Sequence, residues 1–205
     1  MLGITYAPKS KIDLENGELR ANLSALGLGE VKYRDATVKG LALPQEVGLG
    51  IAWRASENLQ LSTKVAWLDW SAALKANTLT ARRPDNPAAP PTISNTTALD
   101  WRDQYVFALG ASYRLDDRTS LWGGYNYGRN PIPERTANPL LGTFGEHHVT
   151  LGLSRRLSER WQFATALEYD VKATLPSNNP ELPFGPGAHE TGELLAFHFG
   201  LSRRW

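Results

Sequence analysis

The stretch LDWRDQYVFALGASYRL, residues 99–115, decides the fold class. Its odd-numbered positions are apolar or aromatic except for Asp103, and its even-numbered positions are charged, polar or small except for Val106. Strict period two is typical of a β-strand whose two faces meet different surroundings. Because a globular strand usually has about five or six residues, this run predicts an unusually long strand.

The same alternation recurs along the chain. Seven further segments have it, at 2–6, 46–54, 59–74, 120–127, 147–156, 161–172 and 197–205. In 59–74 the alternation slips near Trp67 and Trp70, which a β-bulge would explain. A soluble β-sandwich with one wet face gives the same alternation, so the period alone leaves that fold open.

The connections and the aromatic residues favour a membrane barrel. Short connections at 55–58, 116–118 and 158–160 alternate with long ones at roughly 14–40, 75–97, 129–145 and 174–190. Short periplasmic turns and long extracellular loops are typical of outer-membrane barrels, as are aromatic girdles at the strand ends. The expected girdle residues are Trp53, Trp67, Trp70, Trp101, Tyr113, Trp161 and Trp205.

We therefore predict an all-β fold, a transmembrane antiparallel β-barrel with about eight strands, which forms a single domain over residues 1–205. The segments 2–8 and 197–205 are its expected edge strands. The alternation also predicts which side chains face lipid: Phe107, Leu109, Leu151, Leu153, Phe163, Leu167 and Phe199.

Composition excludes several other classes of protein. No run of 18 apolar residues exists, which excludes a transmembrane helix. The net charge is +1 and no cluster of Lys and Arg is present, so we expect no nucleic-acid partner. Cysteine is absent, which suits a protein exported through an oxidising compartment.

Four basic residues are the candidate substrate-binding groups of the barrel interior: Lys64, Arg102, Arg114 and Arg156. They could attract the carboxylate of a fatty acid, or they could belong to a network of mutually neutralising charges that fills the interior. Lys64 and Arg156 are the stronger candidates for carboxylate binding, because Arg102 and Arg114 have aspartates beside them in the sequence.

The sequence offers no candidate for catalysis. His147 and His148 are adjacent, so on a strand they face opposite sides and do not predict a metal site. His198 is expected to point inward alone. No Gly-x-Ser-x-Gly elbow is present. We therefore expect no enzyme activity, no catalytic residue, no bound metal and no cofactor.

The long loops contain apolar residues with two possible roles, capture of a hydrophobic substrate or packing of loop against loop. These residues are Leu23, Leu26, Leu28, Leu41, Leu43, Leu140, Leu141, Phe144, Leu182 and Phe184.

Several segments together resemble the long-chain fatty acid and aromatic hydrocarbon transporters of the bacterial outer membrane. TKVAWLDWS at 63–71 resembles that family's Trp-x-Asp-Trp-Ser strand, and WRDQYVFALGASYRL at 101–115 resembles another of its strands. YNYGRNPIP at 125–133 resembles its Gly-Tyr-x-Tyr-x-x-x-Pro-x-Pro pattern, and HHVTLGLSRRL at 147–157 fits the strand that follows.

The resemblance implies transport of hydrophobic compounds, such as long-chain fatty acids, across the outer membrane. It also implies a barrel of about fourteen strands plugged by an N-terminal hatch, of which this chain would be the C-terminal part without the hatch. Expected partners are outer-membrane lipids, a hydrophobic small molecule, and the barrel assembly machinery through the C-terminal strand. A structural or adhesive barrel without transport, and a porin for polar solutes, stay open as alternatives.

Overall fold

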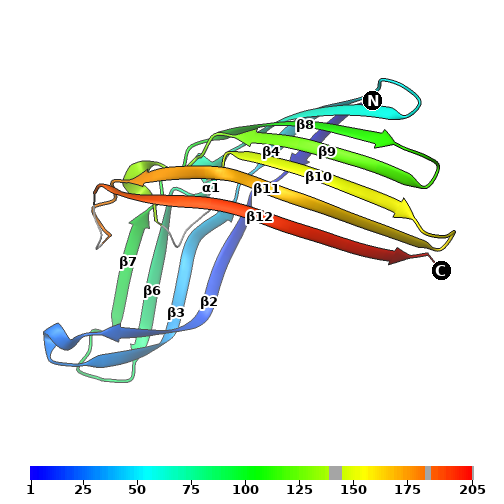
Figure 1. The fold of residues 1–205 in the computed structure, drawn as a ribbon. Coiled ribbons are helices and arrows are strands. Elements are labelled where there is room, and N and C mark those ends of the chain that lie inside the picture. Colours follow the sequence, from blue (N-terminus) through cyan, green and yellow to red (C-terminus); the bar gives the residue numbers. More distant parts are fainter. Residues whose placement is uncertain (139–144, 183–185, 205) are drawn as a thin grey trace. The chain divides into compact units, whose positions relative to one another are not determined.

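The computed structural model describes residues 1–138, 145–182 and 186–204, and these divide into two compact units. Unit 1 contains Met1–Ala7, Glu46–Leu68 and Asp103 onward, and unit 2 contains Pro8–Gln45 and Asp69–Arg102. Both units are built from antiparallel strands (Figure 1). Among the described residues, no helix has both the length and the apolar character needed to cross a membrane.

Unit 1 is one antiparallel sheet of eight strands in the order β1-β4-β5-β8-β9-β10-β11-β12. These strands are β1 (Leu2–Ala7), β4 (Glu46–Arg54), β5 (Leu59–Leu68), β8 (Gln104–Arg114), β9 (Thr119–Gly128), β10 (His147–Arg156), β11 (Trp161–Ser177) and β12 (Ala188–Arg203). The eight predicted strands are therefore all present. The prediction that the first and last strands form the edges is also confirmed.

Two strand boundaries differ from the sequence-based expectation. The long run 99–115 is a strand only from Gln104, because Asp100 has a positive φ of 48° and Leu99 is buried within unit 2. The slip near Trp67 is not a bulge. β5 ends at Leu68, and the Asp69 carboxylate caps a short helix, α1 (Trp70–Ala73), by accepting from the amide of Ala72 at 3.1 Å.

The three short connections of unit 1 share one turn design. Each begins with a side-chain oxygen, from Ser56, Asp116 or Ser158, that accepts hydrogen bonds from the amides two and three residues later. Such Asx and ST turns fix a tight reversal by local hydrogen bonds. A tight turn also fixes which residues of the two flanking strands lie opposite each other.

Unit 2 is formed by residues that the sequence analysis assigned to long loops. Its sheet has the order β2-β3-β6-β7, from β2 (Ser10–Asn22), β3 (Glu30–Leu43), β6 (Ala76–Pro84) and β7 (Thr92–Ala98). Expecting these segments to be loops was therefore wrong. The described residues form twelve strands, eight in one sheet and four in the other. Two 3₁₀ turns complete the described elements, η1 (Ser24–Leu26) in unit 2 and η2 (Glu134–Thr136) in unit 1.

Unit 2 has a hydrophobic core of its own. Val31 and Tyr33 of β3 are fully buried together with Ala81 of β6, and the Tyr33 hydroxyl donates to the carbonyl of Pro90 at 3.0 Å. Gly40 has a φ of +92°, and a Cβ there would lie 2.3 Å from the carbonyl oxygen of Ala76, so no other residue fits this position.

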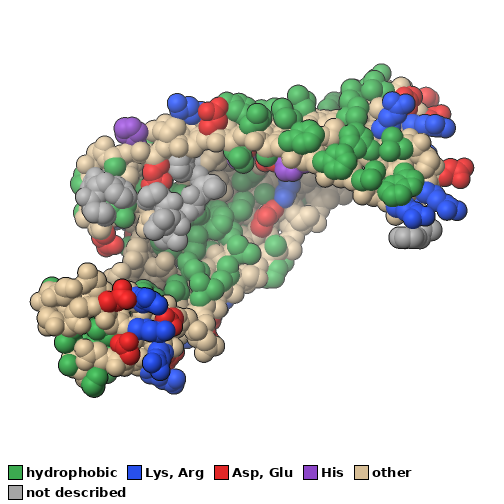
Figure 2. Space-filling view, turned by 60° about the horizontal axis from the view of Figure 1, so that its bottom comes forward, with side chains coloured by type: hydrophobic (Ala, Val, Ile, Leu, Met, Phe, Trp, Pro, Cys, Tyr) green, Lys and Arg blue, Asp and Glu red, His purple; other side chains and the backbone are tan. Residues whose placement is uncertain are grey.

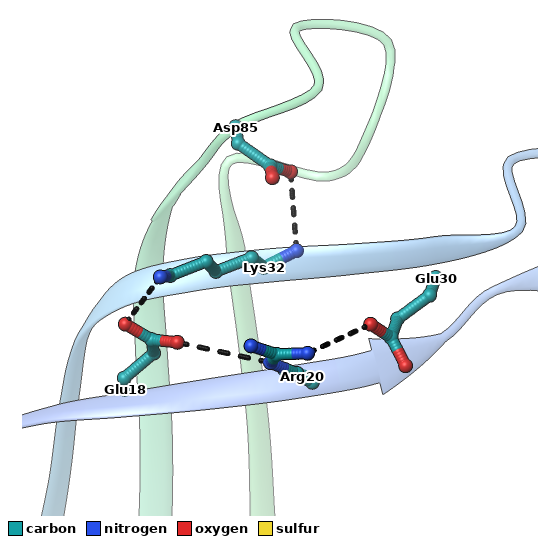
Figure 3. Close-up of polar contacts among 5 residues, drawn as sticks. All are labelled: Glu18, Arg20, Glu30, Lys32 and Asp85. Atoms are coloured by element: carbon teal, nitrogen blue, oxygen red, sulfur yellow. Dashed lines mark hydrogen bonds and ion pairs between the residues drawn. The ribbon is translucent and has the colours of Figure 1, made fainter.

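A charged network lies on the surface of unit 2 (Figure 3). Glu18 lies between Lys32, at 2.6 Å, and Arg20, at 3.8 Å, and Arg20 also contacts Glu30 at 3.5 Å. The backbone amide of Lys32 donates to the carboxylate of Asp85. The hydrogen bond from Lys32 is the main reason that the pKa of Glu18 is lowered. Exposed pairs of this kind contribute little to stability, so the network is expected to add little to the free energy of unfolding of unit 2.

The apolar residues expected in loops have different environments. Leu23 and Leu28 pack against the unit 2 core, which favours the packing role for those two, whereas Leu26 and Leu43 are exposed. Leu140, Leu141, Phe144 and Phe184 lie outside the described residues.

Candidate functional site: the polar face of the eight-stranded sheet

The strand register gives the sheet of unit 1 two chemically distinct faces. We call them the apolar face and the polar face, after two neighbouring rows of side chains that cross the whole sheet. The row on the apolar face is Leu2, Ile51, Thr63, Leu109, Tyr125, Val149, Tyr169 and Leu195. The row on the polar face is Gly3, Gly50, Lys64, Ala108, Asn126, His148, Asp170 and Leu194.

The apolar face exposes large side chains. Leu109 and Leu151 are 60% and 64% exposed, and Phe107, Leu167 and Phe199 are also exposed. In the described part of the chain, all seven predicted lipid-facing residues lie on this face by register. Figure 2 shows hydrophobic side chains spread over the strands of this unit, with Lys, Arg, Asp and Glu gathered where the strands end. A surface this apolar requires a partner or a lipid environment.

Aromatic side chains lie at both ends of the apolar face. Tyr6, Trp67 and Tyr105 form a row near one end, and Tyr113 and Trp161 lie near the short turns at the other. Arg203, a charge on the apolar face, lies over the ring of Trp161 at 5.5 Å, as a cation–π contact at a membrane interface would place it.

Two of the predicted girdle residues are elsewhere. Trp70 and Trp101 lie in unit 2 and pack against each other at 4.9 Å between ring centroids. Assigning them to a girdle on the eight-stranded sheet was wrong, because α1 and the irregular residues before β8 remove them from its strands. Trp205 lies outside the described residues.

Small residues make room for larger ones on the polar face. Lys64 lies opposite Gly50 but leans across Gly48 to reach Glu46, with 2.6 Å between its Nζ and the carboxylate. A Cβ at Gly48 would lie 2.8 Å from the Cε of Lys64. The indole of Trp122 covers Gly152 in the same way, since a Cβ there would lie 2.2 Å from the ring. Sequence reasoning missed Trp122 as a lining residue.

The four predicted cations are not gathered into one site. Lys64 is paired with Glu46, and Arg114 donates to the carbonyl of Glu57 and to the side chain of Asn58 at the turn. Arg156 lies at the end of β10 next to the short turn. Arg102 precedes β8 and belongs to unit 2, so placing it on an inward strand face was wrong.

Two histidine–carboxylate pairs lie on the polar face of β10, β11 and β12. His148 Nδ1 is 2.5 Å from Asp170, directly opposite it, and His198 Nε2 is 2.8 Å from Glu168. The expectation that His198 points inward alone was wrong, because Glu168 bonds to it. His147 lies on the other face and bonds to the hydroxyl of Tyr125, so the expected opposition of His147 and His148 is confirmed.

These features together define a class of protein. An antiparallel sheet with an exposed apolar face, aromatic side chains at both strand ends and a charge-paired polar face has the construction of a transmembrane β-barrel wall.

Comparison with known proteins identifies the family. Residues 1–181 match the family described as outer membrane protein transport protein (OMPP1/FadL/TodX), and the chain belongs to this family. This places it in the bacterial outer membrane, within a family of transport channels rather than enzymes. The resemblance drawn from the sequence is thus confirmed. The comparison with curated proteins gave no match.

Solved structures of similar fold include three outer-membrane proteins. The toluene transporter TbuX of Ralstonia pickettii has a TM-score of 0.68 at 18% identity over 98% of this chain and 43% of its own. A TodX deltaS2S3 mutant monoaromatic hydrocarbon channel has 0.77 at 17% identity over 100% and 46%. A Pseudomonas aeruginosa FadL homologue has 0.67 at 18% identity over 98% and 48%. The chain therefore spans less than half the length of these relatives.

Proposed function

We propose that this protein is part of a channel that carries small hydrophobic molecules across the outer membrane, with the polar face of the eight-stranded sheet lining the path. The observation that carries the proposal is the pairing of charges on this face. Lys64, His148 and His198 each have a carboxylate partner within 2.8 Å. Trp122 presents an aromatic surface among glycine and other small residues. A face with paired charges and an exposed ring offers contact area to an apolar cargo.

We further propose that the cargo is uncharged. Each of the two imidazoles, His148 and His198, lies against a carboxylate, so neither presents an unpaired cation to the cargo. Charge pairs without an excess of positive charge do not attract an anion. The solved relatives named as toluene and monoaromatic hydrocarbon channels support an aromatic hydrocarbon as the cargo.

Fatty-acid transport is the second candidate, and it rests on Lys64 and Arg156. Because Lys64 is paired with Glu46, Arg156 is the better remaining anchor for a carboxylate. A charge-assisted hydrogen bond to a carboxylate contributes roughly 1.5–3 kcal/mol, or about ten- to a hundredfold in affinity. The double variant Lys64→Ala and Arg156→Ala separates the candidates, since it weakens oleate binding only if these cations hold the headgroup.

The experiment compares wild-type protein in liposomes for uptake of toluene, oleate and a small sugar. We expect toluene uptake to dominate. Trp122→Ala should weaken toluene binding by about two- to tenfold, the range of one aromatic contact. Trp53→Ala, an exposed tryptophan on the apolar face, is the matched control and should have no effect.

Three other results would each overturn a part of the proposal. Sugar uptake at the rate of toluene would indicate a porin for polar solutes. No uptake of any solute would indicate a structural or adhesive barrel. Oleate binding lost in the double cation variant would favour fatty acids.

The remaining partners are proposals of the same kind. We propose that outer-membrane lipids contact the apolar face, and that the barrel assembly machinery recognises β12, the edge strand at the end of the sheet.

A further inference from the structure

The polar face contains a group of metal-ligand side chains on three consecutive strands. His148 comes from β10, Glu168 and Asp170 from β11, and His198 from β12. The register brings them together, because His148 lies directly opposite Asp170, and Glu168 lies two residues from Asp170 on the same face. His198 lies opposite Ala166, which is two residues before Glu168 on the same face of β11.

The ligand atoms of these side chains are close to one another. One nitrogen of His148 and one oxygen each of Glu168 and Asp170 lie within 4.8 Å of one another. His198 lies outside this group but contacts it, since its Nε2 is 2.8 Å from the Glu168 carboxylate. These side chains are between one-fifth and three-fifths exposed, so an ion can reach them and they have room to adjust.

A further polar atom in the same row lacks a partner. Asn126 of β9 lies opposite His148 on the polar face, and its Oδ1 is buried without a hydrogen bond in the described structure. Burying a carbonyl oxygen without a partner is unfavourable, and a cation or a water bound to a cation would remove that cost.

We propose that His148, Glu168 and Asp170 bind a divalent transition-metal ion, with Zn²⁺ as the best match, and that His198 holds Glu168 in place through their hydrogen bond. Imidazole nitrogen and carboxylate oxygen are the ligands that zinc takes in proteins, at about 2.0–2.2 Å. Ligand atoms around a tetrahedral ion at that distance are about 3.3 Å apart. On binding, the longer distances among the three ligand atoms would shorten to this spacing. The 2.5 Å distance between His148 Nδ1 and the Asp170 carboxylate would lengthen to it.

The mixed ligand set separates this ion from the common alkaline-earth cations. Ca²⁺ and Mg²⁺ prefer oxygen ligands, of which calcium needs six to eight and magnesium an octahedral set. Two carboxylates with one imidazole do not supply such a shell. The site is therefore expected to bind Zn²⁺ and Co²⁺ but not Ca²⁺.

The test is calorimetric titration of the folded full chain in detergent with Zn²⁺ alone, and separately with Ca²⁺ alone. We expect saturable binding of one Zn²⁺ per chain and no binding of Ca²⁺. The visible absorption of added Co²⁺ gives a second readout, because its intensity reports tetrahedral nitrogen and oxygen ligands.

The variants His148→Ala, Asp170→Asn and Glu168→Gln should each weaken Zn²⁺ binding at least tenfold. The two amide variants keep the size of the side chain and are expected to fold, which circular dichroism checks. His147→Ala is the matched control, because His147 is the neighbour of His148 on the opposite face and should leave binding unchanged.

Three outcomes would overturn the proposal. The first is no saturable Zn²⁺ binding by the wild type, which would mean two ion pairs only. The second is equal loss in His147→Ala and His148→Ala. The third is Ca²⁺ binding as strong as Zn²⁺ binding, which would mean attraction by negative charge alone.

Discussion

The two sheets of this protein are both antiparallel, yet they put hydrophobic side chains in opposite surroundings. Unit 2 buries Val31 and Tyr33 in a core, as a sheet in water must. Unit 1 exposes Leu109, Leu151 and Phe199 in a continuous apolar face. Apolar surface left in water costs roughly 25 cal/mol per Å², so the exposed face favours an apolar environment over water.

The two sheets have the same kind of backbone pairing, so the side chains of each sheet determine which surroundings it favours. In unit 1 the large aliphatic and aromatic side chains are exposed on one face, and paired charges lie on the other. In unit 2 the aliphatic residues form a buried core, and Glu18, Arg20 and Lys32 belong to the surface network drawn in Figure 3. Substitutions that ignore this difference should fail in one unit and be tolerated in the other.

The largest expected effect is in the core of unit 2. Tyr33→Ala removes a fully buried ring and its hydrogen bond to Pro90, which should lower the free energy of unfolding of unit 2 by about 3–5 kcal/mol. Hydrogen exchange of the full protein in detergent measures this, with faster exchange expected in β2, β3, β6 and β7.

Tyr113→Ala is the matched control, because Tyr113 is 45% exposed on the apolar face of unit 1. It should leave exchange in unit 2 unchanged. If Tyr33→Ala speeds exchange equally in both sheets, the two units unfold together and the comparison between them fails.

The second-largest expected effect tests which face of the unit 1 sheet favours lipid. Leu109 is at the middle of β8 on the apolar face, so Leu109→Arg should cost about 2–4 kcal/mol of membrane stability. Ala108→Arg puts the same charge on the polar face, opposite Lys64 and Asn126, and should cost less. Insertion into lipid vesicles measures both variants. Equal insertion would show that lipid does not distinguish the two faces, and better insertion of Leu109→Arg than of Ala108→Arg would show that the faces are exchanged.

The eight strands of unit 1 could be predicted because their side chains alternate between apolar and polar, and because three short turns join six of the strands in pairs. The pair of His148 with Asp170 could also have been predicted, because the tight turn at Ser158 fixes the register of β10 against β11. The pair of His198 with Glu168 was not, because a long connection joins β11 to β12 and leaves their register open.

Unit 2 was missed for a different physical reason. The pairing of β2 with β3 shifts register after Ile12, Leu14 and Gly17, and Asn16 has a positive φ of 57°, so period two does not survive in the sequence. β6 and β7 carry threonine and serine pairs, such as Thr78 with Thr96, in place of an apolar stripe. The ion pair between Lys64 and Glu46 was missed because the two residues lie diagonally across the β4–β5 pair and are far apart in sequence.

The smallest expected effect lies in the turns of unit 1. Asp116 accepts hydrogen bonds from the backbone amides of Arg118, at 2.7 Å, and Thr119, at 2.8 Å, and the bond from Arg118 is the main reason that its pKa is lowered. A lowered pKa means that folding favours the ionised form, so the contribution of this turn is present above the ordinary carboxyl pKa. It is lost as the pH falls through the lowered value, below about pH 4.

The turns at Ser56 and Ser158 use the same hydrogen bonds without an ionisable group, so they should not respond to pH in this range. Amide NMR shifts of Arg118 and Thr119, followed downward from about pH 6, should therefore move while those of Asn58 and Arg160 do not. Asp116→Ser copies the other two turns and should abolish the response with little loss of stability, whereas Asp117→Ser should leave it intact. If the shifts of Arg118 still titrate in Asp116→Ser, another carboxylate controls the turn and the hydrogen bonds to Asp116 are not the cause.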